Sequence, residues 1–328
     1  MPDTELSFLK FLIRRVLQAI PMMLGLMTLV FFLSRLLPGD PSSLYISPGI
    51  PSAVAEHLRS QFGFARPLWD QYLSWLTSIA AGELGRSFAH NAPVRDVLLE
   101  VFPNTMLLGG TALVIETILG VILAMIAVRY VGSGIDRTLS RLVLIVYSLP
   151  SFWIGLLLLA LFSFSFNLFP SSQMYSAGAG ELGGMQAMVD LLKHLTLPAL
   201  TVAIPGAAAI ARYLRTSITE TLGQDYIAAA VGMGLSPTKV FRLYVLPNSI
   251  GPVVSVLGIE IGVLLTGVLV TETLFAWPGM GRIAVMAIFT RDYPMILGCT
   301  LLGGAVVVAA NTLADVIRAW IDPRIRLT

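Results

Sequence analysis

The chain has 328 residues, of which 56% are hydrophobic and only 12% are charged. Soluble domains are about 25% charged, and a soluble fold of this size could not cover so much apolar surface. The composition therefore predicts a membrane protein. The net charge of +2 is too small to indicate a nucleic-acid partner. Cys299, the single cysteine, excludes an internal disulfide.

Six stretches are long and apolar enough for membrane helices, which need roughly 20 residues. They cover approximately residues 16–34, 105–128, 142–166, 195–211, 250–270 and 295–317. The fourth is the shortest and holds Pro198 and Pro205. We therefore expect an all-α membrane protein with six transmembrane helices. The first stretch is too long for the apolar core of a cleavable signal peptide, so we expect none.

Lysine and arginine in the connections predict the orientation, because these residues concentrate in short cytoplasmic loops. If the N-terminus is cytoplasmic, the inner segments hold Lys10, Arg14, Arg15, Arg129, Arg137, Arg141, Arg212, Arg215, Lys239, Arg242, Arg318, Arg324 and Arg326. The outer segments hold eight such residues, five of them in the long first loop, and long loops follow the rule poorly. We therefore expect both termini in the cytoplasm.

The first outer connection divides the chain into three parts. Residues 1–36 form the N-terminal segment with the first span, 37–104 an external insert, and 105–328 the core transmembrane region. The insert opens with a turn at residues 38–41. Residues 67–82 carry tryptophan, tyrosine and leucine at helical spacing, which indicates an amphipathic helix at the membrane interface. A short packed helix without a binding role would have the same pattern.

The connection 167–194 is rich in glycine, serine and alanine, so we expect a mobile loop with a short helix near 185–192. His57, His90 and His194 are too scattered to indicate a metal site.

The cytoplasmic loop 212–248 is the most informative segment. Residues 212–222 should continue the fourth span as a polar helix, and Asp225 should begin a second element over 226–234. Ser236-Pro237 resembles a helix start with proline in the first turn, so a third short helix should run towards Pro247. The middle element is apolar and needs a cover. Either it packs on its own membrane domain or a partner protein binds it.

These residues carry a resemblance. The run Ala228-Ala229-Ala230, then Gly234 and later Leu246-Pro247, resembles the coupling loop of ABC-importer permeases. Other segments resemble the dipeptide, oligopeptide and nickel branch of that superfamily. They are residues 11–15, 37–41, 62–64, 67–72, 82–87, 150–153, 194–200, 224–226, 272–281, 291–294 and 322–326. Together they span nearly the whole chain in order.

The resemblance implies a type I importer permease fold, with a periplasmic insert after helix 1 and a coupling helix between helices 4 and 5. It implies one of two different permease subunits in the bacterial inner membrane, assembled with two ATPase subunits and a periplasmic or lipid-anchored solute-binding protein. The chain would be no enzyme and would bind no cofactor, because ATP and magnesium bind the ATPases. The residues implied to couple to the ATPase are Asp225, Tyr226, Ala228, Ala229, Ala230, Gly234, Leu235 and Pro247.

One departure from the family pattern affects this prediction. The segment from Ile227 to Met233 is uncharged, where the family usually carries arginine or lysine. Ala228 replaces the glutamate found elsewhere in the superfamily. We therefore expect apolar packing, more than ion pairs, to hold the ATPase.

Carboxylates inside predicted spans are costly and by default indicate function. Glu116 and Glu260 lie at membrane depth and Asp315 near the inner interface. Glu116 and Glu260 are candidates for lining the translocation pathway, where they would meet a cationic or zwitterionic solute. Bonding to neighbouring helices, or protonation, would also explain them. The resemblance implies that Glu272, with Pro278, Gly279 and Gly281, organises the external gate or the binding-protein dock.

Enzyme chemistry finds no support in the sequence. No phosphate-binding G-x-x-x-x-G-K-[ST], no G-x-S-x-G, no H-E-x-x-H and no Cys/His cluster occurs. One rival is a secondary transporter driven by an ion gradient, but no second half resembles the first. Another is a scaffold without a pathway, which would leave Glu116 and Glu260 unexplained. Dipeptides, longer peptides, nickel chelates, glutathione and sugars all remain open as the solute.

Overall fold

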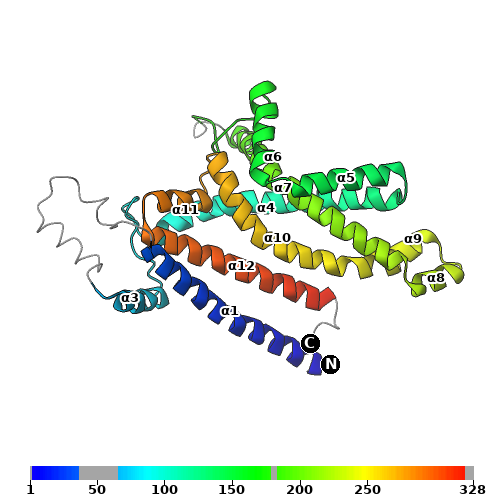
Figure 1. The fold of residues 1–328 in the computed structure, drawn as a ribbon, viewed down its shortest axis with the longest axis horizontal. Helices are drawn as coiled ribbons and strands as arrows, with labels where there is room; N and C mark the ends of the chain where they lie inside the picture. The colour runs from blue at the N-terminus through cyan, green and yellow to red at the C-terminus, as the bar shows by residue number, and fades with distance from the viewer. Residues whose placement is uncertain (1, 37–65, 179–182, 322–328) are drawn as a thin grey trace, which may run out of the picture.

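The structure is a computed structural model that describes residues 2–36, 66–178 and 183–321. The apolar stretches of these ranges form long helices, which Figure 1 shows lengthwise. They are α1 (Pro2–Leu36), α4 (Val94–Arg129), α7 (Gly184–Leu222), α10 (Leu246–Leu274) and α12 (Tyr293–Ile321). No β-strand occurs in the described ranges, where the only pairing of this kind is an isolated bridge between Arg86 and Pro93. The expected all-α architecture is therefore confirmed.

Shorter helices connect the long ones. They are α3 (Leu68–Ala80), α5 (Gly134–Ser148), α6 (Ser151–Leu158), α8 (Asp225–Gly232), α9 (Pro237–Val240) and α11 (Met280–Phe289). Two π-helical segments, Leu159–Ser165 and Phe241–Val245, extend α6 and α9. The turn at 38–41, the segments 62–64 and 322–326, and His57 lie outside the described residues.

Three helices in the described part of the chain are long and apolar enough to cross a membrane, and a bent pair makes a fourth candidate. The three are α4, α7 and residues Tyr293–Ile317 of α12, and the pair is α5 with the helix from Ser151 to Ser165. They correspond to the second, fourth, sixth and third expected spans. α1 and α10 overlap the first and fifth expected spans, but neither is among these candidates. The count of six therefore stays a prediction.

The third expected span is not one straight helix. α5 ends at Ser148, α6 begins at Ser151, and the two axes are bent by 103°. Leu149 has an extended backbone, with φ −83° and ψ 137°. The ring of a proline clashes with the preceding residue when that residue is helical, so Pro150 disfavours a helical conformation at Leu149. Pro150 therefore breaks the span near its middle.

The fourth expected span is longer than the sequence suggested, because the helix expected near 185–192 is present but forms the first part of the same helix. α7 runs without a break from Gly184 to Leu222, through Pro198 and Pro205. Membrane helices tolerate proline when neighbouring groups bind the backbone carbonyls that it frees. The polar continuation 212–222 is confirmed as the last part of this helix.

The coupling loop contains the three expected elements with one difference. α8 begins at Asp225, and α9 begins at Pro237 after Ser236, as expected, although the Ser236 side chain makes no cap hydrogen bond. The third element does not stop before Pro247. It continues through the π-helical segment into α10, where Pro247 lies in the first turn and removes one backbone N–H from the continuous helix.

α4 and α7 pack closely because glycines remove side chains at their crossing. A Cβ atom on Gly120 would lie 2.7 Å from Cβ of Ile210 and 2.9 Å from the carbonyl oxygen of Ala207. A Cβ atom on Gly206 would overlap the carboxylate of Glu116. Small residues of this kind let membrane helices approach until their backbones nearly touch.

α3 packs on α1 through aromatic rings. Tyr72 is buried, and its ring lies 5.3 Å from that of Phe31 and 5.5 Å from that of Phe32. The hydroxyls of Tyr72 and Thr28 are 2.6 Å apart. Trp69 remains largely exposed on the outer side. The expected amphipathic helix is therefore confirmed and is anchored to the first long helix.

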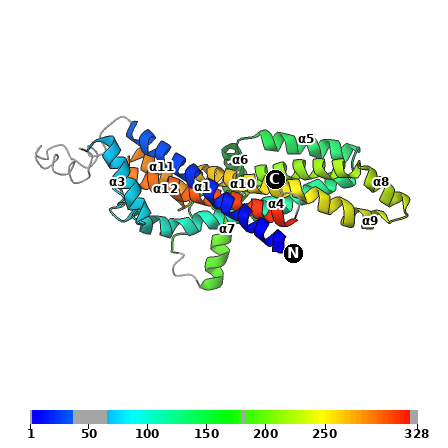
Figure 2. The same ribbon diagram turned by 90° about the horizontal axis from the view of Figure 1, so that it is seen from below.

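The two ends of the bundle carry different elements. α8, α9 and the turn between α4 and α5 lie toward one end, and α3 and α11 toward the other (Figures 1 and 2). The N-terminus and the last turn of α12 point away from α3 and α11. We refer below to the α8 end and the α11 end.

The close contact of α4 with α7 predicts different effects for two glycines of α4. Alanine favours a helix by about 1 kcal/mol over glycine, but overpacking a close contact costs about 1–3 kcal/mol. Gly120→Ala should lower the thermal unfolding midpoint in detergent. Gly110→Ala is the matched control, because a Cβ atom there meets nothing within 4 Å. It should leave the midpoint unchanged or raise it, and equal midpoints for the two variants would contradict this packing.

Candidate functional site

α8 follows α7 almost directly and is anchored by one face. Only Gly223 and Gln224 separate the two helices. Ile227 and Ala230 are buried, 5% and 1% exposed. They belong to an apolar cluster that contains Ala124 of α4, Ile210, Leu214 and Ile218 of α7, Val240, Val245 and Val253. The sequence left open whether this element packs on its own membrane domain or is covered by a partner protein. For this face, the protein's own helices provide the cover.

The other face of α8 is open to a partner. Tyr226, Val231 and Met233 are 43%, 55% and 74% exposed. Asp225, Ala228 and Ala229 are also exposed. Gly234 ends the element with φ +79°, a conformation that glycine adopts without strain. Leu235 turns back and packs against the buried cluster. Of the predicted coupling residues, Ala230 is buried and Leu235 partly buried, whereas the exposed ones are Asp225, Tyr226, Ala228, Ala229, Gly234 and Pro247.

A groove borders this exposed surface. It has a volume of about 890 Å³ and is lined mainly by apolar side chains from the end of α4, the end of α7, α8 and α9. The lining residues are Met125, Ile126, Val128, Arg129, Leu222, Ile227, Val231, Pro237, Thr238, Val240 and Phe241. No sequence pattern indicated the contribution of α4, which comes from a segment about 100 residues earlier in the chain.

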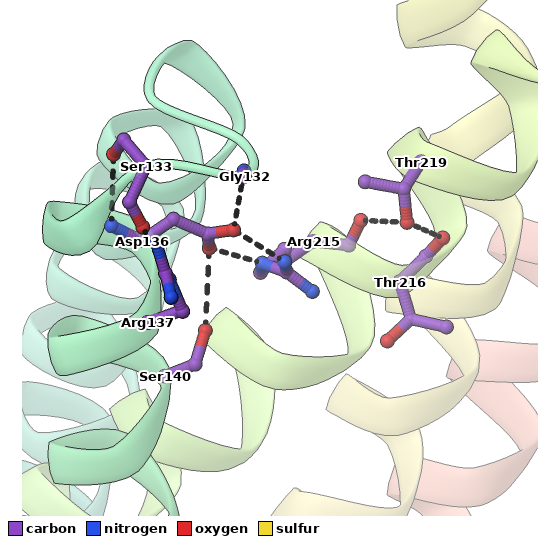
Figure 3. A network of polar contacts seen from close by, with 8 residues as sticks. All are labelled: Gly132, Ser133, Asp136, Arg137, Ser140, Arg215, Thr216 and Thr219. Atoms are coloured by element: carbon purple, nitrogen blue, oxygen red, sulfur yellow. Dashed lines mark hydrogen bonds and ion pairs between the residues drawn. The ribbon is translucent and has the colours of Figure 1, made fainter.

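An ion pair that the sequence did not reveal joins α5 to α7 near the same end (Figure 3). The Arg215 guanidinium donates from Nε to Oδ1 and from Nη2 to Oδ2 of Asp136, each at 2.8 Å. Asp136, only 4% exposed, also accepts from the Gly132 backbone N–H at 3.0 Å and from the Ser140 hydroxyl at 3.3 Å. Two parallel charge-assisted bonds fix both distance and orientation.

The opposite end holds Glu272 in a set of polar contacts. Glu272 is fully buried and accepts from the Thr105 hydroxyl at 2.7 Å and from the Arg282 backbone N–H at 2.9 Å. A Cβ atom on Gly279 would collide with its carboxyl group, and one on Gly281 would lie 2.6 Å from Cα of Leu269 and 3.0 Å from Oε2 of Glu272. Both glycines are therefore required for the chain to pass so close to the carboxylate.

The turn after Glu272 is tied to α4 by further bonds. Trp277, fully buried, donates from Nε1 to the Asn104 carbonyl at 3.0 Å, and Asn104 donates in return to the Pro278 carbonyl at 2.8 Å. The Met280 N–H donates to the Thr105 hydroxyl at 2.8 Å. The residues predicted from 272–281 therefore lie together, and their carboxylate is enclosed by backbone.

A second buried carboxylate joins two segments of the predicted family pattern. Asp292 is fully buried and accepts from the Ser87 hydroxyl at 2.5 Å and from the Ala89 N–H at 3.0 Å. It also accepts from the Met295 N–H at 3.3 Å in the first turn of α12. Segments 82–87 and 291–294 are therefore in contact, which neither pattern indicates by itself.

The remaining candidates lie apart from these sites. Glu116 is 1% exposed and lies against Gly206 between α4 and α7. The side chain of Glu260 lies outside the described residues, although its backbone is part of α10. Asp315 is half-buried in α12. No cluster of three or more potential metal ligands occurs among the described residues.

The contacts of Glu272 predict a stability effect at Thr105. Thr105→Val removes a donor to Glu272 and an acceptor for Met280, and leaving such buried groups without partners costs about 1–3 kcal/mol. The thermal midpoint should fall, and the Met280 and Arg282 amides should exchange faster with deuterium. Thr117→Val is the control, because Thr117 donates only to the Leu113 carbonyl of its own helix. Equal midpoints and exchange rates in the two variants would contradict this role of Thr105.

The chain matches two family descriptions that together cover most of its length. Residues 116–327 match the binding-protein-dependent transport system inner membrane component, and residues 8–109 match the N-terminal part of such membrane components. Permeases of this family are not enzymes, because ATP hydrolysis occurs in the partner ATPase.

Several relatives align over nearly the full length. A Brucella suis protein named as a peptide permease is 39% identical over 98% of this chain and 100% of its own. The dipeptide transport system permease protein DppB of Escherichia coli is 33% identical over 97% and 99%. The oligopeptide transport system permease protein AppB of Bacillus subtilis is 32% identical over 96% and 98%.

Solved ABC transporters share the fold. A chain of the methionine transporter MetNI in an inward-facing conformation aligns with a TM-score of 0.51 at 17% identity, over 69% of this chain and 96% of that chain. A chain of an amino acid ABC transporter aligns with a TM-score of 0.52 at 15% identity, over 69% and 94%. With both halves of the chain matched and relatives above 30% identity, the protein belongs to the family of binding-protein-dependent transport system inner membrane components, the permeases of ABC importers.

Proposed function

We propose that this chain is one of two different permease subunits that together form a pathway for peptides or a related small solute across the bacterial inner membrane. ATP hydrolysis on two partner ATPases would switch this pathway between outward-open and inward-open states. A periplasmic or lipid-anchored binding protein would deliver the solute. The peptide assignment is supported by the names of relatives that align over nearly the whole chain.

The observation that carries this proposal is the two-faced character of α8. Ile227 and Ala230 anchor it to α4, α7 and α10, while Tyr226, Val231 and Met233 remain exposed. A partner that contacts the exposed face differently in its ATP-bound and nucleotide-free states would bias the conformation of the bundle. ATP and magnesium would bind the partner, and this chain would need no cofactor of its own.

The arrangement of the helices supports a topology with six spans. We assign them to α1, α4, the α5–α6 pair, α7, α10 and α12, with the α8 end in the cytoplasm. Both described ends of the chain point away from α3 and α11 (Figure 1), in agreement with cytoplasmic termini. The insert 37–104 would then be periplasmic, and residues 105–328 would form the core with the coupling loop 212–248.

The carboxylates receive different roles in this proposal. Glu272 would organise the outer gate or the binding-protein dock indirectly, by holding the turn that contains Pro278, Gly279 and Gly281. Glu260 would line the pathway on α10. Glu116 lies between α4 and α7, so it would reach the solute only in a state in which these helices separate.

The test of the proposal is co-purification. The tagged chain, expressed with the genes of its transporter and extracted in mild detergent, should bring a second permease and ATPase subunits with it. Proteoliposomes of the complex should take up labelled dialanine in the presence of the binding protein and ATP. A chain that purifies alone and supports uptake driven by an ion gradient would establish the rival secondary transporter instead. The family match does not favour that rival.

The exposed face of α8 predicts an uncoupling variant. Ala229→Arg places a bulky charge on the apolar surface without touching the buried anchors. Burying an unpaired charge in an interface costs several kcal/mol, so uptake and ATPase co-purification should fall at least about tenfold. Thr138→Arg, at an exposed position of α5, is the control and should change neither. Normal uptake with Ala229→Arg would remove this face from the ATPase contact.

A further inference from the structure

The α5–α7 contact is the strongest feature that the proposed function leaves unused. α5 is amphipathic and exposes Leu142 and Ile145 on one side. Its opposite side is attached to α7 at two points. Asp136 forms the paired bonds with Arg215 described above. Two turns further along α5 from Ser140, the centre of the Tyr147 ring lies 4.6 Å from Cζ of Arg212.

The two arginines are adjacent on one side of α7, because residues three apart on a helix are neighbours. The two points that they hold, Asp136 and Tyr147, lie in the first and last turns of α5. Two contacts at the ends of a helix prevent both sliding and rotation, whereas one contact would allow rotation. α5 is therefore attached to the last part of α7 near both of its ends.

Arg215 is also close to the coupling element along the chain. Leu222, the last residue of α7, lies seven positions further along the chain, which is about 10 Å of helix. Thr219 donates to the Arg215 carbonyl at 3.0 Å within this segment (Figure 3). A displacement of α8 therefore reaches Arg215 through the two connecting residues Gly223 and Gln224 and one short helical segment.

The far end of α5 is the place where the backbone can bend. Leu149 and Pro150 interrupt the helix, and α6 leaves at 103° to α5. A helix break of this kind has no continuous hydrogen-bonded ladder across it, so a change of angle costs less there than within α5 or α6. Movement of α5 with α7 would thus appear as a change in the direction of α6.

We propose that the Asp136–Arg215 ion pair, supported by Arg212 on Tyr147, makes α5 and the last part of α7 one rigid body that passes displacement of α8 to α6. Asp136 and Arg215 are then positioning residues for coupling and contact neither the solute nor the nucleotide. This inference rests on the proposed importer function. It adds a second route from α8 into the bundle, beside the direct connection of α9 to α10.

The experiment measures distance and coupling together in the complete transporter in nanodiscs. Cys299 is the only cysteine and is buried, so a Cys299→Ala background permits spin labels at chosen sites. One pair of labels replaces the exposed Thr138 of α5 and Glu220 of α7, and a second replaces Thr138 and Leu157 of α6. Distances are recorded without nucleotide and with ATP in the absence of magnesium.

In the unmodified protein, the α5–α7 distance should be the same in both states and the α5–α6 distance should change. Asp136→Ala should make the α5–α7 distance depend on ATP and lower dialanine uptake per ATP hydrolysed roughly tenfold, within the range of coupling energies between sites. The double variant Asp136→Arg with Arg215→Asp exchanges the two charges. It should partly restore the constant α5–α7 distance and the dialanine uptake per ATP hydrolysed. Arg137→Gln, at an exposed neighbour, is the matched control.

Three results would overturn the inference. One is an α5–α7 distance that already changes with ATP in the unmodified protein. Another is Asp136→Ala with unaltered distance and unaltered uptake per ATP. The third is Asp136→Ala with uptake and ATP hydrolysis reduced equally and the distance constant, which would mean a purely structural pair. Failure of the proposed importer function would give a different result. No ATPase would accompany the unmodified chain, and ATP would change neither the α5–α7 nor the α5–α6 distance. In that case both proposals would be wrong.

Discussion

The close contact between α4 and α7 is the interaction on which the rest of the structure depends. Glycine at 120 and 206 lets the two helices meet where any side chain would collide with Ile210 or Glu116. In a bilayer, apolar surface alone does not drive helices together, so backbone approach and packing must supply the attraction. α7 then presents its other sides to α5, α6 and α10, and its end leads to α8.

The two ends of the bundle are built by different physical means. At the α8 end, a small apolar helix is held by packing alone, through Ile227 and Ala230. At the α11 end, Glu272 and Asp292 are buried carboxylates, each enclosed by hydroxyl and backbone donors. Burying a carboxylate is costly unless hydrogen bonds compensate it. Directional bonds therefore define the turns at the α11 end, whereas the α8 end keeps an apolar surface free for a partner.

α10 connects these two ends in one helix. It starts directly after the coupling loop, at Leu246, and its last turn carries Glu272. A displacement of α9 can therefore reach the turn at residues 275–281 without crossing a loop. Together with the α5–α7 body, this gives the proposed ATPase contact two connections into the bundle, each made of helices joined by short turns, which suits an element that must switch between two arrangements.

The sequence by itself determined the membrane class, the long helices, the amphipathic helix α3 and the position of α8, because these depend on local composition and on spacing along one helix. Only the tertiary structure decided which face of α8 is buried, how sharply Pro150 bends the third span, and that α7 continues through two prolines. It also decided the polar partners. Asp136 and Arg215 are 79 residues apart, Thr105 and Glu272 167, and Ser87 and Asp292 205. No local pattern encodes such pairs, because their contact depends on how distant helices pack.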